Sequence, residues 1–270
     1  MKKFKTDWEE ALARLTAWWA GEKTDRVVAL VTAPREGVSP RPINKKVPDM
    51  YINPEVVFAN LEASLEATFW GGESLPNHWV YLGPVPLSGY LGCEMHFQEN
   101  TVWHTPCFSS LKEHNKLRFT PENKWYQLLC GLTRASVQRS RGQYLVSGQG
   151  FGAASDVMAD LWGAEKILVA TVEEPGVVKK IVRQLTDISC KLYDELDALV
   201  APFQTGSFDW LRLWAPGRMW TIQSDISCML SPKIFSELIL PELIRETEHV
   251  DFCFYHLDGP GAIKHLDSLL

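Results

Sequence analysis

Apolar positions in the first part of the chain recur first at helical spacing and then as a strand-like run. Between Trp8 and Trp19 they return every three or four residues, which predicts an amphipathic helix behind a capping box formed by Thr6 and Glu9. The segment RVVALVTAP at 26–34 is short, rich in β-branched residues and ended by proline. This pattern is typical of a fully buried strand, and we expect it to be the first core strand.

The pattern is less regular over the next hundred residues. Asn53 and Pro54 supply an N-cap and a first-turn residue for a second helix. Residues 77–108 consist of strand-like pieces separated by glycine and proline, which predicts an irregular β insertion. A further helix is expected to begin after Pro121 and to end near Arg139.

The second half of the chain alternates between strand and helix patterns. Strands are predicted within 143–150, 219–227 and 252–256, and each is followed by a helical pattern. Ser231 and Pro232 supply the cap of the helix after the second of these strands. Strand, turn and helix in repetition predict an α/β protein with a parallel sheet or barrel. The chain shows no repeat and no linker, so we expect a single domain over its 270 residues.

Composition narrows the class of partner. The chain is 46% hydrophobic and 22% charged, with a net charge of -6, which leaves no basic surplus to neutralise phosphates. Nucleic acid and membrane are therefore not expected as partners, and a small-molecule substrate is favoured. The start of the chain lacks the apolar stretch of a signal peptide, and we expect a cytoplasmic protein. Nothing in the sequence indicates the oligomeric state.

The cysteines are scattered and form no CxxC pair, which argues against a compact structural zinc site or a disulfide framework. We expect reduced thiols that behave as small hydrophobic residues. They are Cys93, Cys107, Cys130, Cys190, Cys228 and Cys253.

Polar residues at the ends of the predicted strands are the candidates for chemistry, because the carboxyl ends of strands face the active site in a βα barrel. Gln223 and Asp225 share one face of their strand by alternation. His256 and Asp258 do likewise if the last strand extends that far, and Gln149 closes an earlier strand. We predict that Asp225, His256 and Asp258 are catalytic. We further predict that Gln149 and Gln223 bind substrate.

Structural alternatives stay open for these residues. Asp225 precedes a turn and a capped helix, so it could be a turn or capping carboxylate. His256 ends an apolar strand and must be either hydrogen-bonded within the fold or used in chemistry. The His-x-Asp pair could supply two metal ligands, or a base and its electrostatic partner. The string GQGFG lacks the spacing of a dinucleotide-binding loop.

Two stretches, SDISCMLSPKIFSELILPELIRE and YHLDGPGAIKHLDSLL, resemble the uroporphyrinogen decarboxylase superfamily. The similarity is to its decarboxylase-like branch, which is related to corrinoid methyltransferases. It rests on a strand-end Asp, an SP helix start, a proline inside that helix and a strand ending in H-x-D-G. The resemblance is strongest from about residue 143 onward. It implies a (β/α)8 barrel with its site at the carboxyl ends of the strands.

The resemblance implies two enzymatic activities. Uroporphyrinogen decarboxylases remove carboxyl groups from a tetrapyrrole without a cofactor, using an arginine-rich N-terminal motif and an active-site Asp. The corresponding region here reads VTAPREGVSPRP, which holds Arg35 and Arg41 but not the RQAGRY pattern of that motif. On this alternative, Arg35 and Arg41 would bind the substrate by pairing with its carboxylates.

The related methyltransferases pass a methyl group from a corrinoid protein to a thiol, with zinc held by an H-x-C pair and a further Cys. His256 matches the histidine of that pair, and Asp258 stands where its cysteine would be. The resemblance therefore implies zinc on His256 and Asp258, and a corrinoid protein as partner. We predict methyl transfer of this kind. The alternatives are cofactor-free decarboxylation of uroporphyrinogen or a related carboxylate, and a catalytically silent barrel that only binds its partner or a ligand.

The predicted core strands are fewer than the eight that close a barrel. Relative to the superfamily, strands six to eight are missing. We therefore expect an incomplete barrel, either from a truncated reading frame or from a chain that needs a partner to complete it.

Overall fold

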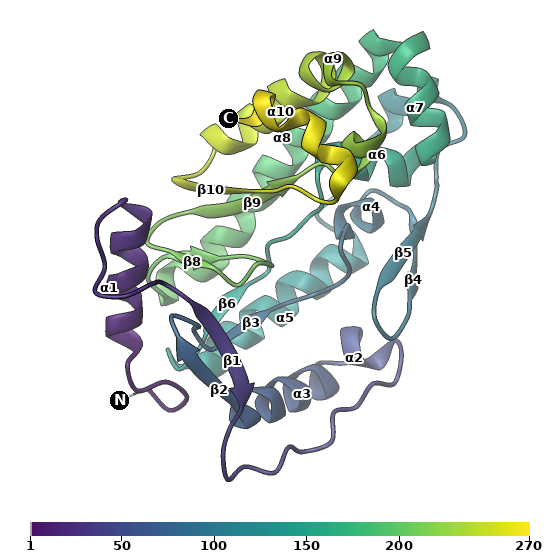
Figure 1. The fold of residues 1–270 in the computed structure, drawn as a ribbon. Helices are drawn as coiled ribbons and strands as arrows, with labels where there is room; N and C mark the ends of the chain where they lie inside the picture. Colours follow the sequence, from purple (N-terminus) through teal and green to yellow (C-terminus); the bar gives the residue numbers. More distant parts are fainter. Residues whose placement is uncertain (1) are drawn as a thin grey trace. The chain divides into compact units, whose positions relative to one another are not determined.

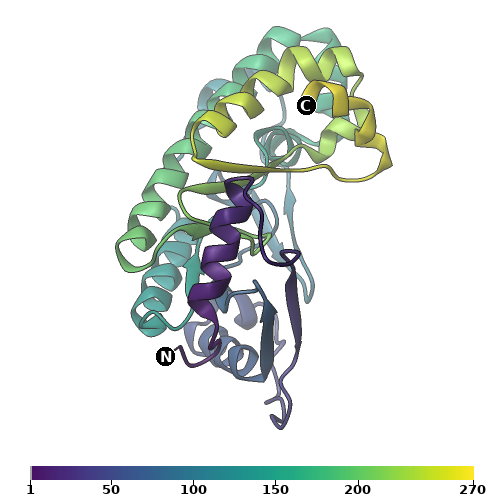
Figure 2. The same ribbon diagram turned by 60° about the vertical axis from the view of Figure 1, so that its left-hand side comes forward.

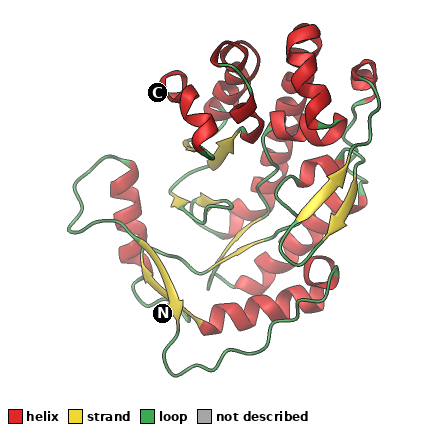
Figure 3. Ribbon diagram, turned by 45° about the vertical axis from the view of Figure 1, so that its right-hand side comes forward, coloured by secondary structure: helices red, strands yellow, loops and turns green. Residues whose placement is uncertain are grey.

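The computed structural model describes residues 2–270, in which helices predominate and the strands are short (Figure 3). The mixed α/β class is as predicted. Within the described residues the strands form five two-stranded sheets, and these do not close into a barrel. No helix in this part of the chain combines the length and the apolar character needed to cross a membrane.

The chain divides into two compact units, each made of three separate stretches. The first unit comprises Met1–Leu82, Leu128–Gln149 and Leu196–Met219. The second unit comprises Gly83–Gln127, Gly150–Glu195 and Trp220–Leu270. The single domain over 1–270 stays a prediction.

The first unit holds most of the short strands (Figure 1). Its helices are α1 (Trp8–Trp19), α2 (Asp49–Ile52), α3 (Pro54–Ala67) and the 3-10 turn η2 (Ala201–Phe203). Its strands are β1 (Leu30–Pro34), β2 (Thr68–Gly72), β3 (Asn77–Trp79), β6 (Leu145–Ser147), β7 (Ser207–Phe208) and β8 (Trp214–Ala215). Three elements contain boundaries between the units, namely α5 (Lys124–Ser140), α8 (Pro175–Val200) and β9 (Met219–Gln223).

The second unit is mainly helical. Its helices are α4 (Pro86–Tyr90), α6 (Ala154–Trp162), α7 (Ala164–Glu173), α9 (Pro232–Ile234), α10 (Leu240–Glu248) and α11 (Leu266–Leu269). It also has the 3-10 helices η1 (Leu111–Lys116), η3 (Asp225–Met229) and η5 (Pro260–His265), and the π-helix η4 (Phe235–Ile239). Its remaining strands are β4 (Glu94–Phe97), β5 (Val102–Thr105) and β10 (Phe252–His256).

Helix α1 forms where the apolar spacing predicts it, but its capping box is wrong. The N-cap residue is Asp7, one position later than expected, and it makes no side-chain cap bond. Its carboxylate instead pairs with the Lys5 ammonium at 3.0 Å. Lys5 is buried and also donates to the carbonyl oxygens of Trp70 and Gly72, at 3.1 and 2.8 Å. A buried ammonium group needs such partners, so the Asp7 carboxylate pairs with Lys5 and does not cap the helix.

Strand β1 corrects the expectation of a buried first core strand. It pairs antiparallel with β2, in the register Leu30 to Gly72, and the two lie side by side in Figure 2. All five of its residues are exposed. An antiparallel pair can leave its faces to solvent, whereas a buried parallel strand needs cover on both sides. Gly72 has a φ of 56° and lies so close to the Ala29 carbonyl that a Cβ would collide with it, so glycine is required at this end of the pair.

The expected β insertion at 77–108 is partly correct. Strand β3 pairs in parallel with β6, in the register Asn77 to Leu145, so its residues belong to a parallel pair and not to an insertion. Beyond it, β4 and β5 form an antiparallel hairpin, in the register Glu94 to Thr105, as strand-like pieces in this region predicted. The short helix α4 lies between β3 and β4 in the chain and was not expected.

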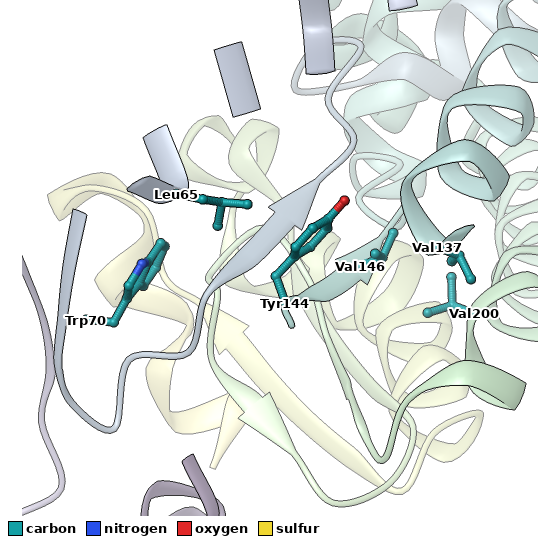
Figure 4. Close-up of a cluster of buried hydrophobic side chains, with 6 residues drawn as sticks. All are labelled: Leu65, Trp70, Val137, Tyr144, Val146 and Val200. Atoms are coloured by element: carbon teal, nitrogen blue, oxygen red, sulfur yellow. The ribbon is translucent and has the colours of Figure 1, made fainter. Parts of the chain in front are cut away.

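A cluster of buried hydrophobic side chains surrounds β6 in the first unit (Figure 4). Its members come from α3, β2, α5, β6 and α8, or from residues next to them. Full burial of a leucine or valine side chain is worth roughly 1.5–3 kcal/mol. The members of the cluster are Leu65, Trp70, Val137, Tyr144, Val146 and Val200.

The predicted helix caps at Asn53 and Ser231 are correct. The Asn53 side chain accepts a hydrogen bond from the backbone N–H of Glu55 at 3.0 Å, with Pro54 as the first residue of α3. The Ser231 hydroxyl accepts from the N–H of Ile234 at 3.3 Å at the start of α9. In each case the side-chain oxygen satisfies an N–H that the first helical turn leaves unpaired.

Candidate functional site

The candidate site lies in the second unit, where two loops follow neighbouring strands. Strands β9 and β10 are hydrogen-bonded neighbours and are drawn side by side in Figure 1. Gln223 is the last residue of β9, and His256 is the last residue of β10. The turn η3 after β9 contacts the turn η5 after β10. The polar residues that end both strands are therefore followed by turns that pack together.

Two of the predicted catalytic residues, His256 and Asp258, act electrostatically on the third, Asp225. Partial desolvation raises the pKa of the Asp225 carboxyl, and the nearby Asp258 carboxylate raises this pKa further. His256 acts in the opposite direction on the same pKa, as a positive charge beside a carboxylate does. The structure thus places His256 and Asp258 close enough to Asp225 to affect its ionisation, although β10 ends at His256 and Asp258 lies in the loop. Their catalytic roles stay predictions.

Gln223 also lies at this cluster. Its side-chain amide donates a hydrogen bond to the Asp225 carboxylate at 3.0 Å. The expected shared face is therefore realised, although Asp225 begins the turn η3 and no longer belongs to the strand. The amide fixes one oxygen of Asp225 in place. A direct role of Gln223 in binding substrate stays a prediction.

Asp156 anchors the turn that carries Asp225, and sequence reasoning missed it. Its two carboxylate oxygens accept the backbone N–H groups of Asp225 and Ile226, at 3.0 and 2.9 Å. Burial raises the pKa of Asp156 to about 7. The neighbouring Ser155 hydroxyl lies 2.9 Å from that of Ser224, which is the residue before the turn. An Asp in the first turn of a helix was the available signal, but the backbone groups that it holds have no sequence signature.

A second layer of buried groups supports the two loops. The Ser227 hydroxyl donates to the Ser224 carbonyl at 2.6 Å, while its own carbonyl accepts from His265 Nε2 at 2.8 Å. The His265 ring is fully buried and stacks on Phe235, with ring centroids 4.2 Å apart. Burial raises the pKa of Tyr255, on β10, to about 12, so its hydroxyl stays protonated. The contacts of His265 therefore pack η3, η4 and η5 together.

Glycine after β10 has a structural explanation. Gly259 has a φ of 73°, a conformation that favours glycine. At Gly261 a Cβ would lie only 3.1 Å from the Cys228 Cβ, so this glycine permits the close approach of η5 to η3. Both glycines therefore help to bring the Asp258 loop against the Asp225 turn.

The other predicted substrate-binding residues belong to the first unit. Arg35 donates to the carbonyl of Phe4 at 2.9 Å, and exposed Arg41 pairs with Glu66 at 2.8 Å. Gln149 is buried, and its backbone carbonyl accepts from the Trp79 indole at 2.5 Å. These contacts give Arg35, Arg41 and Gln149 roles within the fold of the first unit. Their binding of substrate stays a prediction.

The donor set does not by itself fit a zinc site. Residues 2–270 hold no group of three or more His, Cys, Asp or Glu side chains placed to bind one metal ion. Catalytic zinc sites use three protein ligands, whereas the predicted pair His256 and Asp258 supplies two. Zinc at this pair stays a prediction, and no step below depends on it.

Comparison with known proteins identifies a fold and no family. No family model matches the sequence, and no curated protein sequence matches it. Among solved structures, the chain is similar to a methyltransferase from Methanosarcina mazei, with a TM-score of 0.60 and 15% sequence identity. The similarity covers 92% of this chain and 70% of that one. The chain therefore has a methyltransferase-like mixed α/β fold, while membership of the uroporphyrinogen decarboxylase superfamily stays a prediction.

Proposed function

We propose that this chain is an enzyme of the corrinoid methyltransferase type. It would be a member of the uroporphyrinogen decarboxylase superfamily with a barrel-like fold. It would take a methyl group from a corrinoid protein and pass it to a small thiol. The observation that carries the proposal is the electrostatic influence of His256 and Asp258 on Asp225, at the ends of two neighbouring strands. The similarity of the fold to a methyltransferase supports it.

The cluster contains the groups that methyl transfer to a thiol needs. A thiol becomes a strong nucleophile only as the thiolate, so a base must take its proton. His256 would accept that proton, and the carboxylates of Asp225 and Asp258 would stabilise the resulting imidazolium. The sulfur then forms a bond to the methyl carbon. The bond from carbon to cobalt breaks, and its electron pair remains on cobalt.

The anchoring contacts keep this geometry in place. Gln223 holds one oxygen of Asp225, and Asp156 holds the backbone on which Asp225 sits. The Asp258 carboxylate raises the pKa of Asp225, and His256 acts in the opposite direction. A proton passed from the thiol to His256 would therefore add a positive charge that offsets the neighbouring carboxylates.

A methyl-transfer assay on the purified chain tests the proposal. Methylcobalamin serves as the donor and 2-mercaptoethanol as the probe thiol, and the loss of methylcobalamin is followed by absorbance. We expect His256→Gln to lower the rate by about 10²–10⁴-fold, the usual contribution of a general base. His114→Gln, in η1 of the same unit, is the matched control and should keep the rate.

Two outcomes would overturn the proposal. One is a wild-type chain that transfers no methyl group above the background without protein. The other is a His256→Gln variant as active as the control. Turnover of uroporphyrinogen by the wild type, with no methyl transfer, would replace the proposal by the decarboxylase alternative. If the chain binds a corrinoid protein but shows neither activity, the result would favour the catalytically silent barrel.

A further inference from the structure

Two of the cysteines lie side by side in the second unit, away from the Asp225, His256 and Asp258 cluster in the chain. Cys93 precedes β4, and Cys107 comes two residues after β5. The hairpin register places Glu94 opposite Thr105, so the residues just beyond this pair are also close. The two sulfur atoms are 3.3 Å apart. A disulfide bond is about 2.05 Å long, so the sulfurs need to approach by only roughly an ångström.

Backbone hydrogen bonds hold both cysteines in this position. The N–H of Cys93 donates to the carbonyl of Ser88 at 3.0 Å. The N–H groups of Cys107 and Phe108 both donate to the carbonyl of Leu161, at 3.1 and 3.0 Å. The pair, called the hairpin dithiol below, is therefore fixed by α4 and α6 as well as by the hairpin itself.

The two thiols differ in exposure and in acidity. Cys93 is 3% exposed, whereas Cys107 is exposed. The Cys93 thiol donates its hydrogen to the Cys107 sulfur, which lowers the pKa of Cys107 and raises the pKa of Cys93. Of the charged neighbours, Glu113 opposes the first effect and Asp160 adds to the second. An exposed, more acidic thiol beside a buried, less acidic one is the arrangement of an attacking and a resolving cysteine.

Two polar contacts hold the Asp160 carboxylate in position near Cys93. This carboxylate accepts a hydrogen bond from the Ser88 hydroxyl at 2.9 Å, and His104 Nδ1 lies 2.9 Å from the same oxygen. The Cys93 sulfur also contacts the Asp160 carbonyl at 3.9 Å. Negative charge and carbonyl oxygen next to Cys93 disfavour its thiolate. Ionisation is thereby directed to Cys107.

We propose that the hairpin dithiol is a thiol modification site that reacts with low-molecular-weight disulfides such as oxidised glutathione. The Cys107 thiolate attacks one sulfur of the small disulfide, whose S–S bond breaks. One half leaves as a thiolate and takes up the proton that Cys107 gave up. Cys107 is now joined to the other half as a mixed disulfide.

Cys93 completes the exchange. Its sulfur forms a bond to the Cys107 sulfur, the mixed disulfide breaks, and the second half leaves with the proton of Cys93. In sum, the protein dithiol is oxidised to a disulfide while one small disulfide is reduced to two thiols. This inference is independent of the proposed methyl transfer, because it uses none of the residues of that site.

The test treats the full chain with oxidised glutathione and follows it by intact mass and peptide mapping. The wild type should lose two hydrogens and yield a peptide that links Cys93 to Cys107. Cys93→Ser should instead stop at one glutathionyl group on Cys107, because the resolving thiol is gone. We expect Cys107 to react about tenfold faster than half-buried Cys228. Cys228→Ser is the matched control and should behave as the wild type.

Three results would overturn the inference. The first is modification of Cys228 or another thiol as fast as that of Cys107 in the wild type. The second is the absence of the link between Cys93 and Cys107 after complete reaction. The third is a Cys107→Ser variant in which Cys93 is modified as fast as Cys107 is in the wild type. The rates and the final products of the wild type alone decide the first two, so the test does not depend on the folding of a variant.

Discussion

Strands β1 and β9 have the same length and a similar apolar pattern, yet they end in opposite environments. All five residues of β1 are exposed, whereas the first four of β9 are buried. The segment after β1 is a long loop with charged residues and prolines, while β9 is followed at once by a turn fixed by Asp156. An apolar run therefore predicts an extended backbone, but the anchoring of the residues that follow distinguishes the buried strand from the exposed one.

The largest expected stability effect separates these two strands directly. Ile222 in β9 is 5% exposed, and Ile222→Ala should lower the free energy of unfolding by about 2–5 kcal/mol. Val31 in β1 is 46% exposed, and Val31→Ala should lower it by less than about 1 kcal/mol. Urea unfolding followed by circular dichroism measures both. Equal effects would contradict the difference in burial.

A smaller effect is expected from the anchor of the turn after β9. Asp156→Asn keeps one acceptor oxygen but places an NH₂ group against one of the two backbone N–H donors. We expect the free energy of unfolding to fall by roughly 1–3 kcal/mol, the usual loss for a buried donor left unsatisfied. Asp267→Asn, at an exposed position, is the control and should change it by less than about 0.5 kcal/mol. An Asp156→Asn variant as stable as this control would show that the turn needs no anchor.

Two buried acids, Glu73 in the first unit and Glu246 in the second, differ in their pairing, and pH should reveal this. Glu73 in the first unit accepts from the Arg26 guanidinium at 3.1 Å. Glu246 in α10 is also buried, and burial raises its pKa from 4.5 to about 8, with smaller contributions from Glu242 and Asp156. Above pH 4.5 the unfolded chain loses this proton while the folded chain keeps it up to about pH 8. Its contribution to stability is therefore full below pH 4.5 and is lost as the pH rises through this window.

Glu246→Gln removes that titration. Between pH 5 and 7.5 the decline of stability with pH should become less steep by about 1.4 kcal/mol per pH unit, the value for one proton. Urea unfolding at a series of pH values measures the slope. Glu248→Gln, an exposed residue of the same helix, should leave the slope as it is. An unchanged slope in Glu246→Gln would show that Glu246 is already ionised in the folded chain.

Local sequence signals predicted several of the elements and led to the grouping of Asp225, His256 and Asp258. The caps at Asn53 and Ser231 depend on side chains that act within three residues, so their sequence spacing is sufficient. Asp225, His256 and Asp258 could be grouped because polar residues ending two neighbouring strands lie at the same edge of a sheet. In each of these cases the interacting residues can be recognised from their type and from their position relative to a helix start or a strand end.

What could not be predicted depends on distant backbone groups. Asp156 holds N–H groups 69 and 70 residues away, and any residue other than proline offers such a group. The capping box at α1 failed because Lys5 reaches the carbonyl oxygens of Trp70 and Gly72 and occupies the carboxylate of Asp7. The closeness of Cys93 and Cys107 likewise follows from the register of a hairpin and not from a CxxC spacing.

The central claim is that Asp225, His256 and Asp258 share one site, and the pKa of Asp225 reports on it directly. A carbon-13 NMR titration of the Asp225 carboxyl would compare the wild type with Asp258→Asn and His256→Gln. Removal of the Asp258 charge should lower the pKa of Asp225, and removal of the His256 charge should raise it, while Asp267→Asn should leave it unchanged. A pKa of Asp225 that moves in neither variant would contradict the shared site.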